Sequence, residues 1–560
     1  MRVTNRRRLT IRHLAALGAA MGLCVLGCRL PAPDGYRPPP QDTHEVLAMR
    51  LKDMSQAPPV SVEQATTEAA AQLAPTSQPA ASLELSLDEV RASALASNLD
   101  LKVELVTPTI AEQSISEARA RFEALLFGSL EHGRIDEPSS VVDGVPQEWS
   151  TTQGEAGLKV PLPTGGEITL SMPASYANDQ QNTHGASQEN GYAYDPVYDA
   201  GLKFSISQPL LRNAGFRANT HTIRVARYQR DIAGARTKLA AIRILANADR
   251  AYWLVYAGRR ELEVVQQQHE LALQQLSDAR KRVAAGDSPE IEIMRAESGV
   301  ASRLEAIIIA RTSLRRRERD LKRMMNRADL PLNSPTTLVP TTDPDPVGLT
   351  LDAEGLADYA VAERMELLEL ELQLAIDDSS IDFERNAALP LFVLDYTYQT
   401  AGVGGSFHEA FRDTDGHRYG DHTLSLRAEI PLGNEAARSR VRRAMLERVQ
   451  RLATREQRRL AIRQEVYDAV DGLEQDWQRI LAARQEVVLA GRTYEAEKRQ
   501  FEVGLRTSTD VLEAAARLAS AQSREIQALA AYEVSQVDIA FACGVLLGQT
   551  GVTWEQTPSP

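Results

Sequence analysis

The strongest constraint on the fold of this chain is an internal duplication. The segment Asn98-Leu99-Asp100-Leu101 returns as Arg364-Met365-Glu366-Leu367, and Ala284-Ala285-Gly286 returns as Glu502-Val503-Gly504. In each copy the expected order is a helix, strands, a very long helix, a tight turn and a second helix. Repetition of a whole unit favours a pseudo-symmetric architecture and places the two turns in equivalent positions.

A very long helix is the clearest element of each copy. Small and apolar residues recur at alternating steps of three and four from Ala241 to Val283 and from Ile462 to Phe501, which is typical of a coiled-coil seam. Each helix should cover roughly 65 to 70 residues, or about 100 Å. We expect Gly286 and Gly504 to end these helices, because glycine is common just past a helix C-terminus. Shorter helices should return over residues 289–326 and 507–547.

Alternating segments precede each long helix. In Gly201–Gln208, Leu202, Phe204 and Ile206 alternate with polar residues, and a period of two predicts a strand. Such segments predict four strands in the first copy and two in the second, at residues 125–130, 152–161, 167–172, 201–208, 391–399 and 422–430. Residues 178–195 and 400–421 should form polar loops.

The first helix of the first copy has a start signal and a break signal. Ser86 followed by Glu89 has the spacing of a capping box. Helical patterning continues to about Ala120, and Pro108 is expected to break or kink the helix.

The N-terminus is typical of export. Residues 1–27 combine a basic start with a short apolar run, and small and aliphatic residues precede Cys28. This pattern resembles a bacterial lipoprotein signal, which predicts cleavage before Cys28 and acylation (palmitate) of its thiol. An ordinary signal peptide with an incidental cysteine is the alternative. Residues 28–80 are rich in Pro, Ala, Gln, Ser and Thr, as in a flexible linker.

The composition and motifs disfavour several functions. A formal charge of −13 argues against nucleic acid. With Cys24 and Cys28 assigned to the signal and the anchor, Cys543 is expected to be a small buried hydrophobe, and no internal disulfide is possible. We find no zinc-protease, Cys-pair or phosphate-loop motif, and therefore expect no catalytic residue, cofactor or metal. A loop containing His408, His417 and His422 is a weak metal candidate, and solvated histidines are the simpler interpretation.

Two long hairpins and a few strands cannot bury themselves in a monomer, and six strands or fewer do not close a channel-sized barrel. The sequence therefore predicts an α+β membrane protein. Long antiparallel coiled-coil hairpins would be joined to strands that several copies pool into one wall.

At this point the chain resembles the TolC-like family of outer-membrane efflux proteins. The resemblance covers about Leu85 to Gly548. It is carried by the duplication, by the strand exit Ser207-Gln208-Pro209-Leu210, and by the segment from Phe501 to Glu513, which reads Phe-Glu-Val-Gly-Leu-Arg-Thr-Ser-Thr-Asp-Val-Leu-Glu.

The family resemblance implies a homotrimer that shares one outer-membrane β-barrel and extends a helical tunnel through the periplasm. Its tip would meet a periplasmic adaptor and an inner-membrane pump in an efflux or export system. The chain departs from the family at Gly286-Asp287, where Gly-Leu is common, and in the extra hairpin at residues 152–172. With that hairpin in the wall the barrel would exceed the usual twelve strands; otherwise the hairpin lies outside the wall.

Acidic residues just past the second turn are the main site candidates. Asp510 and Glu513 are three apart on a helix and share a face, and a trimer would place them in rings that favour cations. The resemblance implies a periplasmic gate at these positions, with Arg506 as a cross-linking partner and Glu292 as the acid of the first copy. The simpler interpretation is that Asp510 stabilises a helix N-terminus.

The turns themselves form the expected adaptor-docking tip, at Gly286, Gly504 and Leu505. Leu505 is expected either to be a buried staple of the turn or to contact an adaptor.

The expected organisation has two repeats, residues 81–330 and 349–549, with a linker at 331–348 and a tail at 550–560. Two other functions remain open, a periplasmic adaptor lipoprotein and a structural coiled-coil protein that spans the envelope.

Overall fold

The structure is a computed structural model that describes residues 81–137, 147–179, 197–286, 289–415, 420–503 and 505–554. The predicted signal peptide, Cys28 and the Pro-rich linker lie outside these residues, as do Gly504 and His417.

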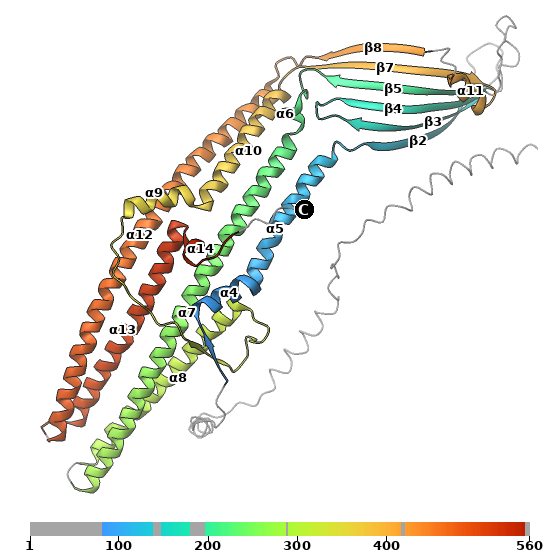
Figure 1. Cartoon of the computed structure of the whole chain (residues 1–560). Coiled ribbons are helices and arrows are strands. Elements are labelled where there is room, and N and C mark those ends of the chain that lie inside the picture. The colour runs from blue at the N-terminus through green and yellow to red at the C-terminus, as the bar shows by residue number, and fades with distance from the viewer. Residues whose placement is uncertain are drawn as a thin grey trace, which may run out of the picture. The chain divides into compact units, whose positions relative to one another are not determined.

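Two copies of one unit follow each other along the chain (Figure 1). The first copy comprises β1 (Ser82–Leu85), α4 (Leu87–Ser97), α5 (Leu99–Ala120), β2 (Leu125–Glu137), β3 (Gln147–Pro161), β4 (Glu167–Asp179), β5 (Val197–Pro209), α6 (Phe216–Asn219), α7 (His221–Ala284) and α8 (Ile291–Met325). The second comprises β6 (Thr337–Pro340), α9 (Ala353–Glu363), α10 (Met365–Ala387), β7 (Leu391–Gly404), α11 (Phe407–Asp415), β8 (Gly420–Glu429), α12 (Glu435–Glu502), α13 (Ser508–Cys543) and α14 (Leu546–Gln549).

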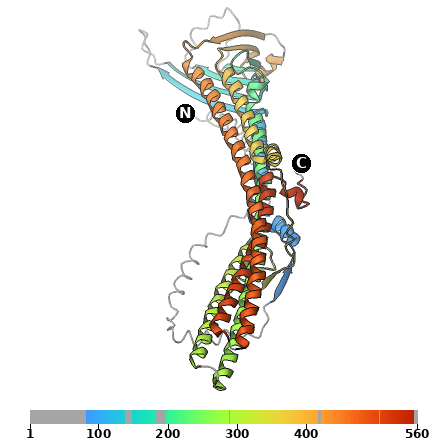
Figure 2. The same ribbon diagram turned by 90° about the vertical axis from the view of Figure 1, so that its left-hand side faces the viewer.

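The predicted long helices are confirmed as α7, with 64 residues, and α12, with 68. Each packs lengthwise against the shorter helix that follows it, α8 and α13 respectively, and α7 also packs against α13. Figures 1 and 2 show α7 (green) and α12 (orange) running away from the sheet. The predicted seam of α7 supplies buried alanines and Val255, whose small side chains permit close helix packing.

The helix pairs that open the two copies break at equivalent residues. Asn98 separates α4 from α5, and Arg364 separates α9 from α10; each is 4% exposed. The Asn98 Nδ2 donates to the Met324 carbonyl (3.0 Å) at the end of α8, and the Arg364 Nη1 donates to the Ala542 carbonyl (3.0 Å) at the end of α13. In both copies a buried polar side chain therefore fastens the break to the end of the same hairpin.

Pro108 does not break the helix as one form of the prediction held, because α5 continues through that residue. The break lies at Asn98, whose side chain caps α5 by accepting a hydrogen bond from the Leu101 N–H (3.0 Å). The predicted capping box of Ser86 and Glu89 is confirmed.

Six strands form one antiparallel sheet in the order β2-β3-β4-β5-β7-β8. All lie where the sequence predicted strands, and most are longer. The predicted extra hairpin is β3–β4, with its turn at residues 162–166, where Gly165 has a φ of 91°. A left-handed backbone of this kind favours glycine.

The two faces of the sheet differ in polarity. Every pair in the register joins two odd-numbered or two even-numbered residues, so all even-numbered side chains share one face. Most exposed large apolar side chains of the strands are on the even face: Leu126, Leu130, Leu158, Leu170, Met172, Leu202, Leu394, Leu424 and Leu426. The exceptions, Leu125 and Val403, lie at or next to strand ends.

Two elements correct the sequence analysis. The expected linker at 331–348 contains β6, which pairs in parallel with β1. The expected loop at 400–421 begins as the end of β7 and contains α11, whose Thr414 hydroxyl donates to the Ala200 carbonyl (3.1 Å) on β5. Cys543 is buried in an apolar cluster with Ile462 and Val466, as expected.

None of the helices that the structure describes is both long and apolar enough to span a bilayer.

Candidate functional site

The predicted site residues lie in or just after two turns, one from α7 to α8 and one from α12 to α13, which are called the hairpin tips below. Ala285 caps α7, and Gly286 follows with a φ of 84°. At the second tip the Leu505 N–H donates to the Gln500 carbonyl (2.9 Å), a spacing typical of a Schellman motif. Gly504 itself lies outside the described residues.

Asp510 closes a capping box at the start of α13. Its Oδ2 accepts hydrogen bonds from the Thr507 N–H (2.9 Å) and the Thr507 hydroxyl (2.8 Å). The backbone hydrogen bond, followed by the hydroxyl, lowers the pKa of Asp510 below its usual value. Within a single chain Asp510 therefore stabilises the start of α13, as the simpler interpretation expected. Because its pKa is lowered, the carboxylate is charged at neutral pH.

Glu292, near the start of α8, joins the two hairpins. It accepts a hydrogen bond from the Ser508 hydroxyl on α13 and a second one from the Arg295 Nη1 (2.8 Å) on its own helix. The carboxylate is only 17% exposed. The acid proposed for the first tip thus contacts the first residue of α13 in the second tip, and not Asp510 or Arg506.

A second contact joins the hairpins close by. The Arg282 guanidinium of α7 lies over the Phe501 ring of α12, 4.1 Å from the ring centroid. This is the geometry of a cation–π interaction. The ring face of Phe501 therefore connects the second copy of the duplicated unit to the first.

Arg506 and Glu513 make local contacts. The Arg506 Nε lies 3.1 Å from the Glu497 carboxylate and donates to the Gln500 side chain (3.0 Å), both on α12. Glu513 is exposed and accepts from Arg517 (2.8 Å) one turn further along α13. The four predicted gate residues therefore lie near the tips but do not form one cluster within a single chain.

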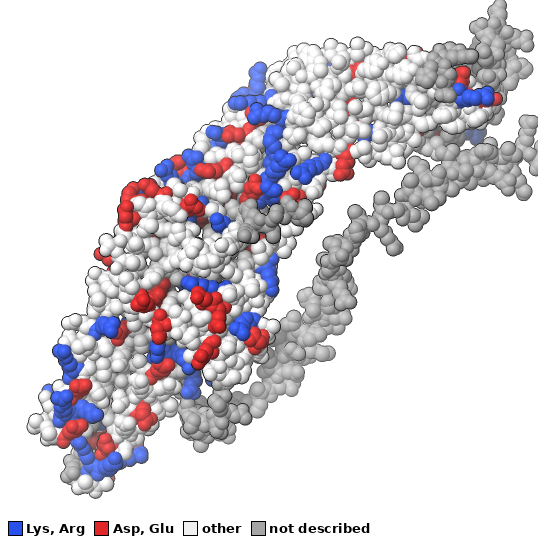
Figure 3. All heavy atoms as spheres, viewed as in Figure 1, with Lys and Arg blue, Asp and Glu red and all other residues white. Residues whose placement is uncertain are grey.

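Leu505 is 76% exposed. The interpretation as a buried staple is therefore wrong, and the side chain is available for contact with another molecule. Charged residues of both signs surround the lower ends of the helices, whereas the visible surface of the sheet carries few charges (Figure 3).

Sequence reasoning missed Ser508 and Arg282. Ser508 follows the capping residue of α13 and looks like ordinary helix-start chemistry. Arg282 lies next to the seam residue Val283, where a charged residue normally faces solvent. Only the packing of one hairpin against the other gives these residues their partners.

The histidine candidates do not converge in the described part of the chain. His408 lies on α11, and His422 on β8 hydrogen-bonds to the Tyr396 hydroxyl (3.0 Å). Among the described residues there is no group of three or more His, Cys, Asp or Glu side chains placed to hold a metal ion.

Comparison with known proteins identifies similar chains. A family model described as "Outer membrane efflux protein" matches residues 356–545, from within α9 to just past α13. "Outer membrane protein TolC" of Vibrio cholerae serotype O1 (strain ATCC 39315 / El Tor Inaba N16961) is 24% identical over 356 residues, which cover 63% of this chain and 78% of that protein.

Solved structures show the same fold. A crystal structure of CusC, described in connection with transmembrane channel formation, has a TM-score of 0.60 at 14% identity, and the match covers 84% of this chain and 95% of the CusC chain. The Campylobacter jejuni CmeC outer membrane channel has a TM-score of 0.59 at 14% identity, with 82% and 85% covered. Residues 356–545 therefore resemble the outer membrane efflux proteins in sequence, and the whole unit, with its duplication and paired hairpins, has the fold of the solved outer-membrane channels.

Proposed function

We propose that three copies of this chain form a lipid-anchored channel that carries solutes passively from the periplasm through the outer membrane. The strands of the three copies close one wall in the membrane, and the helical hairpins extend the bore into the periplasm. Energy comes from an inner-membrane pump reached through a periplasmic adaptor at the tips, so the channel itself performs no chemistry.

The observation that carries this proposal is a two-faced sheet with two unpaired edges. In β8 and β2 the leucines of the even face are strongly exposed, for example Leu424 at 71% and Leu126 at 74%. A long apolar edge strand left in water is prone to aggregation. The sheet of each chain has an even number of strands. When chains stand side by side, β8 of one chain therefore runs antiparallel to β2 of the next chain, and the even faces stay on the outside. A closed ring of copies therefore satisfies both edges.

The membrane wall also distinguishes this function from the alternatives. A structural coiled-coil protein needs no apolar sheet face, and the family match favours a channel over an adaptor. The predicted acylation of Cys28 would hold the N-terminus at the same membrane, before the linker of residues 28–80.

The tips are the proposed gate. Three copies of Asp510 and Glu513 around one axis would form carboxylate rings that favour cations. The contacts from Glu292 to Ser508 and from Arg282 to Phe501 would hold the two hairpins of each chain in the closed packing. An adaptor that contacts Gly286, Gly504 and Leu505 would shift the hairpins to an open packing.

Planar-bilayer recording tests the channel and the gate. The purified protein should have the native mass of a trimer and conduct ions. Replacing Asp510 and Glu513 with alanine should raise the conductance and weaken the preference for cations. Asp471→Ala with Glu474→Ala is the matched control, since these two exposed acids have the same spacing in the middle of α12. A monomeric particle, or a protein without conductance, would refute the channel. Equal effects of the two double variants would refute only the gate.

Two further variants test attachment and docking. The Cys28→Ser protein should still require detergent for extraction, because the wall and not the lipid holds it in the membrane. Leu505→Asp should reduce co-purification of the native adaptor while leaving the bilayer conductance unchanged. Release of Cys28→Ser protein by buffer alone would count against a membrane-spanning wall.

A further inference from the structure

The β3–β4 hairpin is an integral part of the sheet and not an appendage. β3 pairs with β2 from Leu125↔Lys159 to Glu137↔Gln147, and β4 pairs with β5 from Glu167↔Ser207 to Ala177↔Val197. The hairpin therefore separates β2 from β5 along their whole length, and a wall built from this sheet must include it.

The hairpin also carries both faces of the sheet. Leu158, Leu170 and Met172 lie on the even face and are 40%, 50% and 41% exposed. In the register, Leu126, Leu158, Leu170 and Phe204 form one row across β2, β3, β4 and β5. A hairpin folded outside the wall would leave these apolar side chains in water, whereas hydrocarbon suits them.

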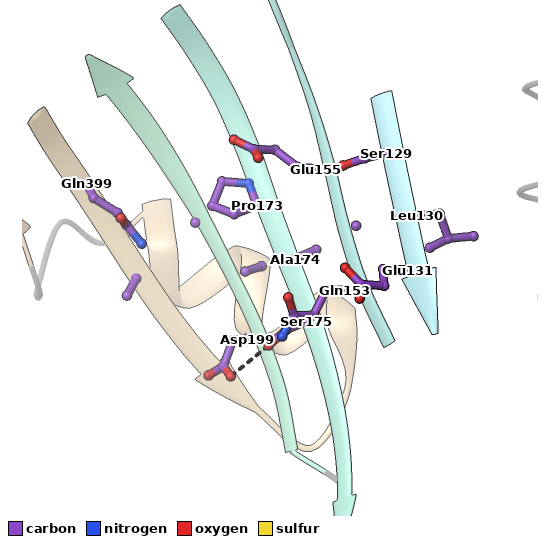
Figure 4. A pocket seen from close by; sticks show the side chains of 14 residues that line it. Ser129, Leu130, Glu131, Gln153, Glu155, Pro173, Ala174, Ser175, Asp199 and Gln399 are labelled. Atoms are coloured by element: carbon purple, nitrogen blue, oxygen red, sulfur yellow. Dashed lines mark hydrogen bonds between the residues drawn. The ribbon is translucent and has the colours of Figure 1, made fainter. Parts of the chain in front are cut away.

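The odd face of the hairpin is polar and lines a hollow of about 600 Å³ with its neighbours. Figure 4 shows Gln153, Glu155 and Ser175 with Asp199 of β5, whose carboxylate accepts a hydrogen bond from the Ser175 hydroxyl (3.0 Å). Ser129 and Glu131 lie on this side of β2, and Leu130 on the other. The hairpin thus matches the surrounding strands on a water-facing side as well as on a lipid-facing side.

We propose that the trimeric wall has eighteen strands and a bore wide enough for bulky polar solutes. This inference rests on the proposed function. Six strands from each of three copies make eighteen. With strands about 4.8 Å apart and tilted by about 40°, the backbone radius is about 18 Å, against about 12 Å for twelve strands. After inward side chains are allowed for, the open diameter is about 2 nm instead of about 1 nm.

This wide exit sets the size class of the cargo at the outer membrane. Solutes up to about 2 nm across would pass the wall, and selection by size would occur at the tips. The lumen would be hydrated, because Glu131, Glu155 and Asp199 of each copy face it.

Polymer access from the cell exterior measures the bore directly. A reporter cysteine replaces Ser205, an odd-face residue of β5, in a Cys543→Ser background. The trimer is treated in outer-membrane vesicles with maleimide polymers of about 1 to 3 nm diameter. The comparison variant lacks residues 147–179, so that β2 can pair with β5 and each copy has four strands. Phe204→Cys, on the even face, is the control for lipid-facing positions.

The full chain should be labelled by polymers up to about 2 nm and the deletion variant only up to about 1 nm, with little labelling of the Phe204→Cys protein. If the full chain and the deletion variant are both trimeric and are both labelled only by polymers up to about 1 nm, the eighteen-strand wall is refuted. The proposed channel would not be refuted by that result. If even small maleimides fail to reach Ser205→Cys, or if the particle is monomeric, the proposed function itself fails. If the deletion variant does not assemble, the full chain still decides: a limit near 1 nm contradicts the wide wall.

Discussion

The hydroxyl of Ser508, the first residue of α13, donates a hydrogen bond to the carboxylate of Glu292 on α8. These residues belong to different copies of the duplicated unit, and together they connect the two hairpins at the tips. The carboxylate is mostly shielded from water and also holds Arg295. A small change at this contact should therefore alter how firmly the two hairpins stay together.

Ser508→Ala should loosen the tips. It removes a hydrogen bond to a charged group, which contributes about 1.5 to 3 kcal/mol, and it leaves Glu292 with Arg295. We expect a higher open probability in planar bilayers. Ser520→Ala, at an exposed position further along α13, should behave like the wild type, and a Ser508→Ala channel as closed as the Ser520→Ala channel would contradict this role.

The Arg282–Phe501 contact should give a measurable interaction free energy between the two side chains. A double-mutant cycle of Arg282→Gln and Phe501→Leu on the closed-to-open equilibrium should give about 0.5 to 1 kcal/mol, the range for an exposed cation–π pair. Phe501→Tyr retains an aromatic face and should retain most of the coupling. Additive effects of the two single changes would show that the ring and the guanidinium act independently.

Glu533 on α13 should make stability depend on pH. Its side chain is buried, and its Oε1 has no hydrogen-bond partner within the described part of the chain. Burial, and then the charge of Asp345, raises the pKa of Glu533 to about 7, despite a hydrogen bond from the Asp345 backbone. Since the folded state binds this proton more tightly than the unfolded state, stability should rise as the pH falls from about 7 towards about 4.3.

Thermal unfolding of the purified protein between pH 5 and pH 8 tests this expectation. Glu533→Gln should raise the melting temperature at pH 8 by on the order of a few degrees and flatten the pH dependence. Glu525→Gln, at an ion-paired glutamate of the same helix, should leave the slope in place. An unchanged slope in the Glu533→Gln protein would assign the pH dependence to other groups.

Substitutions at Asn98 and Arg364, the two equivalent helix breaks, should lower the free energy of unfolding by different amounts. Arg364 forms ion pairs with Glu366 (2.6 Å) and Glu465 (2.9 Å) in addition to its bond to Ala542. Arg364→Met would remove one of the two cations paired with the mostly buried carboxylate of Glu366, which keeps Arg458 (3.0 Å), and should cost about 3 kcal/mol. Asn98→Ala removes the cap of α5 and the bond to Met324, and should cost about 1 to 2 kcal/mol. Chemical unfolding measures both, and equal losses would contradict the ion-pair argument.

The sequence predicted the elements whose signal is local and periodic. The seams of α7 and α12, the turn at Gly165 and the alternation in β5 and β7 all depend on near neighbours in the chain. The capping box at Ser86 was predictable for the same reason. The glycines expected at the ends of the two long helices also located the ends of α7 and α12 along the chain.

The elements that the sequence did not predict depend on distant partners. β1 and β6 pair in parallel although about 250 residues separate them, and each strand has only four residues. α11 forms where Ala410 and Thr414 pack onto the sheet. The helix α5 tolerates Pro108 because packing overrides local propensity. The partners of Glu292 and Phe501 likewise come from the other copy.

The position of the β3–β4 hairpin has an evolutionary consequence. The hairpin enters and leaves at the end of the sheet far from the long helices α7 and α12, and its own tight turn closes at the other end. Strands could therefore be gained or lost two at a time without changing the direction of any later strand or the helices that follow. In the proposed channel, the calibre of the outer opening could therefore evolve separately from the hairpin tips.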